Sequence, residues 1–180
     1  MRVEESYDLA RKILRKSCGN HNPEEICKCL GIELYEFDLG NLKGMYSSAD
    51  RHRTIFLNKR LKGYLRRFVL AHEIGHDQIP EHRELARSKP YKELQFFGGR
   101  NNTEREANSV AAHILIDDKQ MIDMIKEGRT LHQMASELYV PEDLLLIELE
   151  DYGKLHPDFV VNLPRLSRGN YLKDYTDGTF

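Results

Sequence analysis

The stretch LAHEIGH at residues 70–76 is the most informative segment of the chain, because it places two imidazoles and one carboxylate on a short segment of helix. A helix advances by about 100° per residue, so His72 and His76 return to nearly the same face and can bind one metal ion. Glu73 lies beside that face, where its carboxylate can take a proton from water activated by the metal. A catalytic zinc site has three protein ligands and an open fourth position. The stretch therefore predicts a zinc hydrolase with Glu73 as general base and one further ligand elsewhere in the chain.

A core helix that tolerates two histidines is the competing interpretation of the same stretch. Leu61, Leu65 and Phe68 precede the histidines at helical spacing, so His72 and His76 continue an apolar stripe that faces the core. Buried imidazoles without polar partners are costly. One shared metal ion satisfies both rings together, and we therefore favour the metal site.

The third ligand is sought on a second helix, which the pattern of residues 103–115 predicts with Thr103 as its N-cap. Glu104 and Asn108 are four residues apart and share a face with two alanines, whereas Glu106 points to roughly the opposite side. We therefore choose Glu104 as the third metal ligand. Small residues on that face let the helices approach closely, so Asn108 can bond the second ring nitrogen of a ligating histidine. In the alternative interpretation, Glu104 only complements the helix dipole and Asn108 is a solvated polar residue.

Together these motifs resemble the ImmA/IrrE-type metallopeptidases, a family related in mechanism to the gluzincins. The similar segments are two strands, the first zinc helix and a downstream ExEAN motif: residues 42–46, 54–58, 67–76 and 104–108. The resemblance implies that His72, His76 and Glu104 bind Zn²⁺ and that the general base is Glu73. It also implies a narrow protein substrate, typically a helix-turn-helix transcriptional repressor of a phage, mobile element or stress response.

Two segments depart from the usual pattern of this family. The family continues its first zinc helix with an apolar segment, whereas residues 77–82 are polar here and Pro80 ends the helix. Many relatives read Leu-Met-Pro after the second helix, where residues 115–118 of this chain read LIDD. Neither change touches a proposed ligand. Both bear on substrate preference, because such loops border the cleft.

The order of elements predicts an α+β fold with a small antiparallel sheet packed on the zinc-binding helix pair, a minimal gluzincin-like protease core with additional C-terminal helices. The expected early elements are helices at residues 3–17 and 23–30, followed by strands at residues 32–37, 44–47 and 54–58. Residues 81–102 show no sustained period and are interpreted as a part-helical loop bordering the active site. We divide the chain into a metallopeptidase core (1–117), a helical part packed on it (118–156) and a tail of unspecified structure (157–180).

Three short helices are expected in the C-terminal part, at residues 118–127, 130–138 and 142–151. The break at residues 139–141 resembles that of a helix-turn-helix. The last helix, however, has no lysine or arginine to contact phosphates or read guanine, so we reject it as a recognition helix. We expect it to pack on the protease body or to offer Leu144, Leu145 and Leu149 to a partner.

Composition gives no reason to expect direct binding of nucleic acid or a membrane. The 180 residues carry a net charge of −2, with 40% hydrophobic and 31% charged residues, as in an ordinary globular protein. A local basic cluster is interpreted as a solvated helix face, with an acidic partner as the alternative: Lys59, Arg60, Lys62, Arg66 and Arg67. The absence of a signal-peptide core and of an apolar span predicts a cytoplasmic protein. Three cysteines without a zinc-finger spacing predict neither a disulfide framework nor a second metal site with His21.

Two functions from different classes remain open. The first is a zinc endopeptidase, in which the edge of the strand at residues 54–58 binds an extended substrate and Tyr46 or His82 is a candidate donor to the oxyanion. The second is a regulatory module that contains zinc and inactivates a repressor by binding alone. Glu73 favours the first, because a purely structural zinc site has no use for a carboxylate beside the metal. The sequence does not specify the oligomeric state, the scissile bond or the activating signal.

Overall fold

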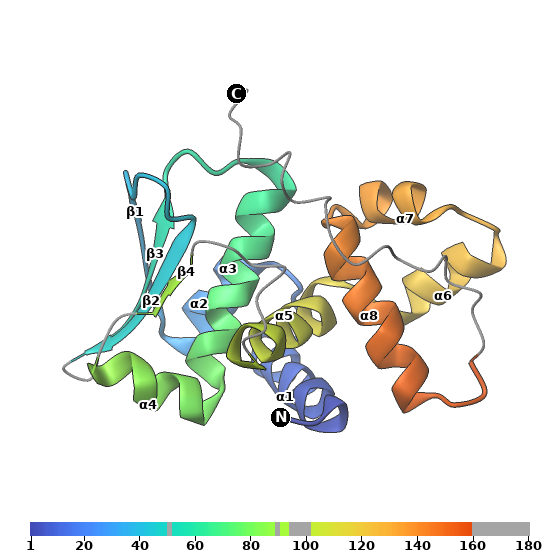
Figure 1. The fold of residues 1–180 in the computed structure, drawn as a ribbon, viewed down its shortest axis with the longest axis horizontal. Helices are drawn as coiled ribbons and strands as arrows, with labels where there is room; N and C mark the ends of the chain where they lie inside the picture. Colours follow the sequence, from blue (N-terminus) through green and yellow to red (C-terminus); the bar gives the residue numbers. More distant parts are fainter. Residues whose placement is uncertain (50–51, 89–90, 94–101, 160–180) are drawn as a thin grey trace.

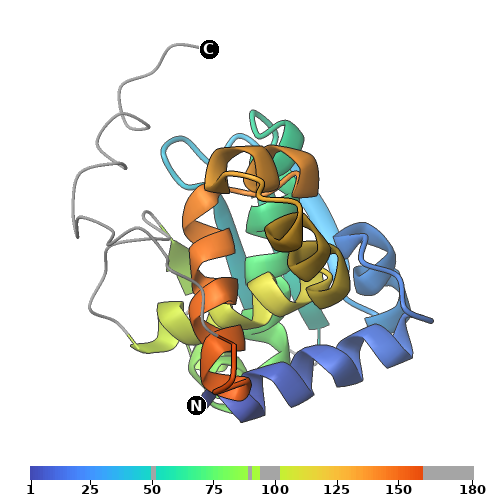
Figure 2. The same ribbon diagram turned by 90° about the vertical axis from the view of Figure 1, so that its right-hand side faces the viewer.

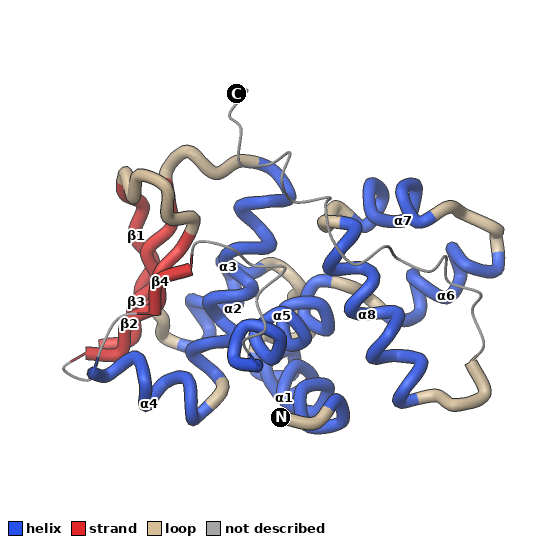
Figure 3. The backbone as a smooth tube through the Cα atoms, in the orientation of Figure 1, coloured by secondary structure: helices blue, strands red, loops and turns tan. Residues whose placement is uncertain are grey.

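The computed structural model describes residues 1–49, 52–88, 91–93 and 102–159, and it shows an α+β fold (Figure 1). The helices are α1 (Val3–Lys16), α2 (Pro23–Leu30), α3 (Gly63–Gln78), α4 (Pro80–Ser88), α5 (Asn102–Leu115), α6 (Asp118–Lys126), α7 (Leu131–Leu138) and α8 (Glu142–Leu155). The strands are β1 (Glu33–Phe37), β2 (Gly44–Ala49), β3 (His52–Asn58) and β4 (Tyr91–Glu93). The strands gather at one end of the described structure, and helices make up the rest (Figure 3). The predicted fold class is therefore confirmed.

The sheet is mixed, which corrects the expectation of a wholly antiparallel one. Its strand order is β1-β3-β2-β4, and β2 pairs antiparallel with both β3 and β4. β1 pairs parallel with β3, so β3 lies between the two strands that precede it in the chain. Alternating side chains specify that a strand forms but not which neighbour it takes. The prediction that the edge of β3 binds substrate is also wrong, because β3 is an inner strand and the edges are β1 and β4.

Local capping explains why the helix limits lie close to those predicted. At α2, the side chain of the N-cap Asn22 accepts a hydrogen bond of 3.0 Å from the amide of Glu24, and Gly31 ends the helix in the left-handed region at φ 64°. A capping box between Thr130 and Gln133 starts α7. The prediction of Thr103 as N-cap is wrong, since α5 already includes Asn102.

The segment after α3 has more regular structure than the sequence pattern indicates. Pro80 follows the end of α3, as predicted, but it also begins α4, because proline suits the first turn of a helix. Residues 91–93 then form β4 against β2. Of the predicted loop at 81–102, residues 89–90 and 94–101 lie outside the described structure, as do residues 160–180 of the predicted tail.

Helix α3 is the centre of the fold, and its residues 68–77 are all buried. The sheet packs on one side of it and α5 on the other (Figure 1). A Cβ on Gly75 would lie 2.9 Å from the carbonyl oxygen of Ala107, so only glycine allows the two helices to come this close. Small side chains at the contact are what the proposed ligand geometry requires.

Of the C-terminal helices, α8 packs against the other side of α5, and α7 packs on α8. Leu144, Leu145 and Leu149 are all buried, so they belong to the core and are not offered to a partner. Figure 2 shows α1 running beneath α5, and the C-terminal end of α8 lies next to the start of α1. Among the described residues, no helix is long and apolar enough to cross a membrane.

Candidate metal centre

Helices α3 and α5 bring His72, His76 and Glu104 together, and we call these three residues the α3–α5 cluster. The two Nε2 atoms of the histidines are 3.0 Å apart. The Oε2 atom of Glu104 is 3.1 Å from Nε2 of His72 and 3.4 Å from Nε2 of His76. All three side chains are buried, and the cluster could hold a metal ion. In the part of the chain that the structure describes, no other group of three such residues converges in this way.

The spacing of the three ligand atoms fits zinc. Ligands that bind zinc tetrahedrally with bonds of about 2.0–2.1 Å are about 3.3–3.4 Å from one another. The distances of 3.0, 3.1 and 3.4 Å lie close to that value. Two imidazoles and one carboxylate are also a ligand set of catalytic zinc sites. The residues present therefore fit the metal that the sequence pattern predicts.

The electrostatics of the cluster favour the protonation states that metal ligands need. Burial lowers the pKa of His76 to about 3, so its ring is neutral. Burial alone would raise the pKa of Glu104, but the adjacent rings of His72 and His76 outweigh this effect and lower it. The cluster therefore contains a neutral imidazole and an ionised carboxylate at neutral pH.

Asn108 lies one helical turn beyond Glu104, against His72. Its Oδ1 atom is 2.8 Å from Nδ1 of His72. An amide oxygen can only accept, so Nδ1 of His72 carries the hydrogen and donates it to Asn108. The neutral ring then has a bare Nε2, which is the atom that faces Glu104.

The side chain of Glu73 extends from α3 toward Gly44 at the start of β2. It is 1% exposed, and a Cβ on Gly44 would overlap its Oε1 atom and lie 2.8 Å from Cγ1 of Val69. Glycine at position 44 therefore gives the Glu73 carboxylate its room. The sequence pattern places Gly44 in a strand but indicates no such role.

The two candidate donors to the oxyanion have other partners. Tyr46 is buried, and its hydroxyl donates to Oδ1 of Asp77 at 2.9 Å. Asp77 also accepts a hydrogen bond from Arg53 of β3, so it ties the end of α3 to the sheet. His82 contacts His76 through one ring nitrogen and Glu106 through the other. The hydroxyl of Tyr46 and both ring nitrogens of His82 thus have partners within the described structure.

His82 and Glu106 are the residues near the cluster whose placement the sequence does not reveal. The sequence pattern puts His82 in a polar segment after the zinc helix and Glu106 on the far side of its helix. In the structure, α4 turns back toward α3, so that His82 contacts His76. Burial at this position lowers the pKa of His82. The available signal was the break at Pro80, which can redirect the chain.

A second buried polar group occupies the other side of α5, and we call it the α5–α8 cluster: Ser109, His113, Glu148 and Asp151. Nδ1 of His113 is 3.0 Å from Oε1 and 2.8 Å from Oε2 of Glu148. The hydroxyl of Ser109 donates to Oδ2 of Asp151. Burial raises the pKa of Glu148 to about 7, and the carboxylate of Glu148 raises the pKa of His113 against the effect of burial.

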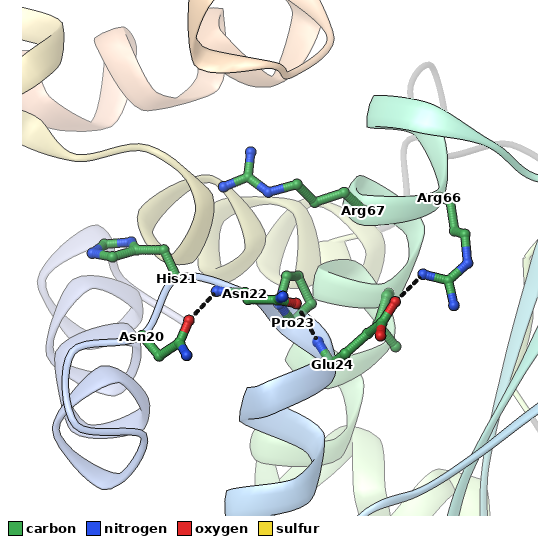
Figure 4. A pocket seen from close by; sticks show the side chains of 8 residues that line it. Asn20, His21, Asn22, Pro23, Glu24, Arg66 and Arg67 are labelled. Carbon is green, nitrogen blue, oxygen red and sulfur yellow. Dashed lines mark hydrogen bonds and ion pairs between the residues drawn. The ribbon is translucent and has the colours of Figure 1, made fainter.

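A pocket of about 410 Å³ lies apart from the α3–α5 cluster, between the segment that leads into α2 and the start of α3 (Figure 4). Arg66 reaches Glu24 and Glu36 there, whereas Arg67 donates to the carbonyl oxygens of Leu138 and Leu115. These two arginines of the predicted basic cluster thus have structural partners. The pocket contains none of the predicted site residues.

An α+β fold with two histidines and a glutamate around a possible metal position is typical of the metallopeptidase class. Residues 27–150 match the model of the IrrE N-terminal-like domain family, Peptidase_M78, and the chain belongs to this family. The resemblance found in the sequence is thereby confirmed. The chain is also similar to the "Uncharacterized immunity region protein 2" of Bacillus phage phi105. The two are 29% identical over 143 residues, which cover 79% of this chain and 87% of the phage protein.

Proposed function

We propose that the protein is a zinc-dependent endopeptidase that cleaves a specific protein substrate. The observation that carries the proposal is the α3–α5 cluster, in which His72, His76 and Glu104 converge with a spacing that fits zinc. Glu73 follows the first of these histidines on the same helix. A carboxylate in this place serves catalysis and is not needed to hold a structural zinc ion. Membership of the Peptidase_M78 family supports the same class of function.

In this mechanism, His72, His76 and Glu104 hold Zn²⁺, and Asn108 fixes the ring of His72 through its Nδ1 hydrogen. Bound zinc would supply a Lewis acid that makes water nucleophilic near neutral pH. A carboxylate oxygen of Glu73 takes the proton of the attacking water and then passes it to the amine of the leaving peptide. Gly44 contributes indirectly, because it leaves space for that carboxylate.

We further propose that the substrate is a DNA-binding repressor of the helix-turn-helix class, encoded by a phage, mobile element or stress-response system. The name of the similar phage protein, which refers to an immunity region, supports this substrate class. Cleavage of such a repressor would take place in the cytoplasm and would relieve repression. The protein itself is not expected to bind DNA, since its net charge is −2 and α8 has no basic residue before Lys154.

The Glu73→Gln variant tests the proposal. We expect it to reduce cleavage of a cognate repressor by at least about 10²–10⁴-fold, because the general base is lost, while zinc content and the unfolding transition stay unchanged. Glu84→Gln on α4 is the matched control, because Glu84 is exposed and pairs only with Arg87 in the described structure. Repressor fragments are measured by mass spectrometry. Equal cleavage by the parent and Glu73→Gln would refute the proposed mechanism.

A regulatory module that binds zinc and inactivates a repressor without hydrolysis is the second candidate. The burial of Glu73, which is 1% exposed, favours it, because a general base must reach water and substrate. The same variant separates the two functions. If Glu73→Gln relieves repression as well as the parent does, binding and not proteolysis is the mechanism.

A further inference from the structure

His82 connects the α3–α5 cluster to a residue on the far side of α5. It comes from α4 and is 2% exposed. Its Nδ1 atom is 3.1 Å from Nδ1 of His76, and its Nε2 atom is 3.0 Å from Oε2 of Glu106. Glu106 also pairs with the amino group of Met1 through its other oxygen. Three helices thus meet in one line of contacts that ends at His76.

The chemistry of Glu106 fixes where the hydrogens lie along this line. An ionised carboxylate can only accept, so Nε2 of His82 carries a hydrogen and donates it to Glu106. A neutral imidazole has one hydrogen, which leaves Nδ1 of His82 as an acceptor. That atom faces Nδ1 of His76, so the hydrogen of His76 lies on Nδ1. The bare nitrogen of His76 is then Nε2, which is the atom that faces Glu104.

His72 has the same tautomer, with its hydrogen on Nδ1, but a different residue accepts that hydrogen. Asn108 accepts its Nδ1 hydrogen from within α5, whereas His76 depends on His82 from α4. The two bare Nε2 atoms are 3.0 Å apart and both face Glu104. Without these outer partners, the carboxylate of Glu104 would draw the hydrogen of either ring to Nε2, and that ring would lose its lone pair toward the metal position.

We propose that His82, oriented by Glu106, is a positioning residue that holds His76 in the tautomer and ring orientation required of a metal ligand. The inference rests on the proposed function in one respect, because it takes the α3–α5 cluster as the zinc site. It adds a residue of α4 to that site and explains why the polar segment after the zinc helix turns back toward it. Outer partners of ligating histidines typically change metal affinity by about 10–100-fold.

The test is the zinc affinity of the full chain, measured after metal removal by competition with a chromogenic chelator. We expect His82→Ala to weaken zinc binding by about 10–100-fold. His82→Gln should restore most of the affinity, because its amide can accept from His76 and donate to Glu106. Glu106→Ala should weaken binding less than His82→Ala does. His132→Ala is the matched control and should bind zinc as the parent does, since His132 is exposed on α7.

A second measurement keeps the inference testable if His82→Ala does not fold. Long-range ¹H–¹⁵N NMR correlations of the metal-free parent should show His76 with its hydrogen on Nδ1, and His82→Gln should preserve this signature. Glu106→Ala should give a mixture of tautomers. A parent with the hydrogen of His76 on Nε2 would overturn the inference.

The outcomes also separate this inference from the proposed function. Tight zinc binding by the parent and equally tight binding by His82→Ala would overturn the inference and leave the proposed peptidase intact. Zinc binding that weakens in His82→Ala, together with no cleavage of any repressor, would support the inference and refute the peptidase. A parent that binds no zinc would overturn both.

Discussion

The two polar clusters on either side of α5 contain similar residues but differ in how their hydrogens are distributed. In the α5–α8 cluster, His113 has a carboxylate beside its Nδ1 atom and the hydroxyl of Ser109 donates to Asp151. In the α3–α5 cluster, the outer nitrogens of both histidines are bonded, which leaves two bare nitrogens and a carboxylate facing one point. The first arrangement pairs its histidine and its hydroxyl with carboxylates, whereas the second directs two ring nitrogens and a carboxylate at one position that a cation could occupy. A buried histidine beside a carboxylate is therefore not in itself a metal site.

The largest difference between the two clusters is expected when one histidine or carboxylate is removed from each. We expect His76→Ala and Glu104→Ala to lower zinc affinity by about 1,000-fold or more. Only three side chains supply the large free energy of zinc binding, so the loss of one removes a large part of it. His113→Ala should leave zinc affinity within about threefold of the parent, although its ring is equally buried. Elemental mass spectrometry and chelator competition measure both. Loss of zinc in His113→Ala would show that the clusters are not independent.

The next largest effect is expected on folding stability, from the α5–α8 cluster. Glu148→Ala leaves His113 buried without its carboxylate, so the free energy of unfolding should fall by about 3–5 kcal/mol. Glu137→Ala on α7 is the control, because that side chain is about half exposed, and it should change stability by less than about 0.5 kcal/mol. Urea unfolding followed by circular dichroism gives both values. A fall below about 1 kcal/mol in Glu148→Ala would mean that the pair adds little to the fold.

A smaller effect is expected where α3 meets α5. Gly75→Ala forces a methyl group against the backbone of Ala107, and we expect it to destabilise the fold by about 1–3 kcal/mol. A Cβ on Gly153 of α8 would meet no described atom within 4 Å, so Gly153→Ala should be neutral or stabilise by up to about 1 kcal/mol. The two variants compare one substitution in two helices. Equal effects on the urea midpoint would contradict the close approach of α3 and α5.

The α5–α8 cluster should also make stability depend on pH. The pKa of Glu148 is raised from 4.5 to about 7 in the folded protein, and that of His113 is also raised. The folded state therefore binds more protons than the unfolded state between about pH 4.5 and 7, so this pair contributes stability at low pH that is lost as the pH rises. Tyr7, Asp118 and Asp151 are the other titratable groups that face the pair. The stability of Glu148→Gln relative to the parent should therefore increase from pH 4.5 to 7.

Thermal unfolding in a series of buffers measures that difference, and Glu137→Gln is the control. The control should track the parent at every pH, because Glu137 is exposed and outside the cluster. A difference between the parent and Glu148→Gln that stays constant with pH would mean that the pair does not titrate in this range.

The metal-ligand candidates and the helix limits could be predicted because they depend on local geometry. His72 and His76 are one turn apart on any helix, and Glu104 and Asn108 share a face for the same reason. Asn22, Gly31 and Thr130 mark helix ends through bonds to their own backbone neighbours. The structure brings His72, His76, Glu104 and Asn108 together as expected, and their roles in zinc binding stay a prediction.

The α+β class, the zinc-hydrolase pattern and the family could be inferred from the amino-acid sequence alone, since each rests on residues close together in the chain or on their order. The three-dimensional packing was needed to show that β1 runs parallel to β3, that Gly44 makes room for Glu73, and that His82 lies between His76 and Glu106. These contacts join segments that are independent in sequence, and the turn after Pro80 sets where α4 returns. Local spacing fixes which face a side chain occupies, whereas the packing of whole elements fixes what that face meets.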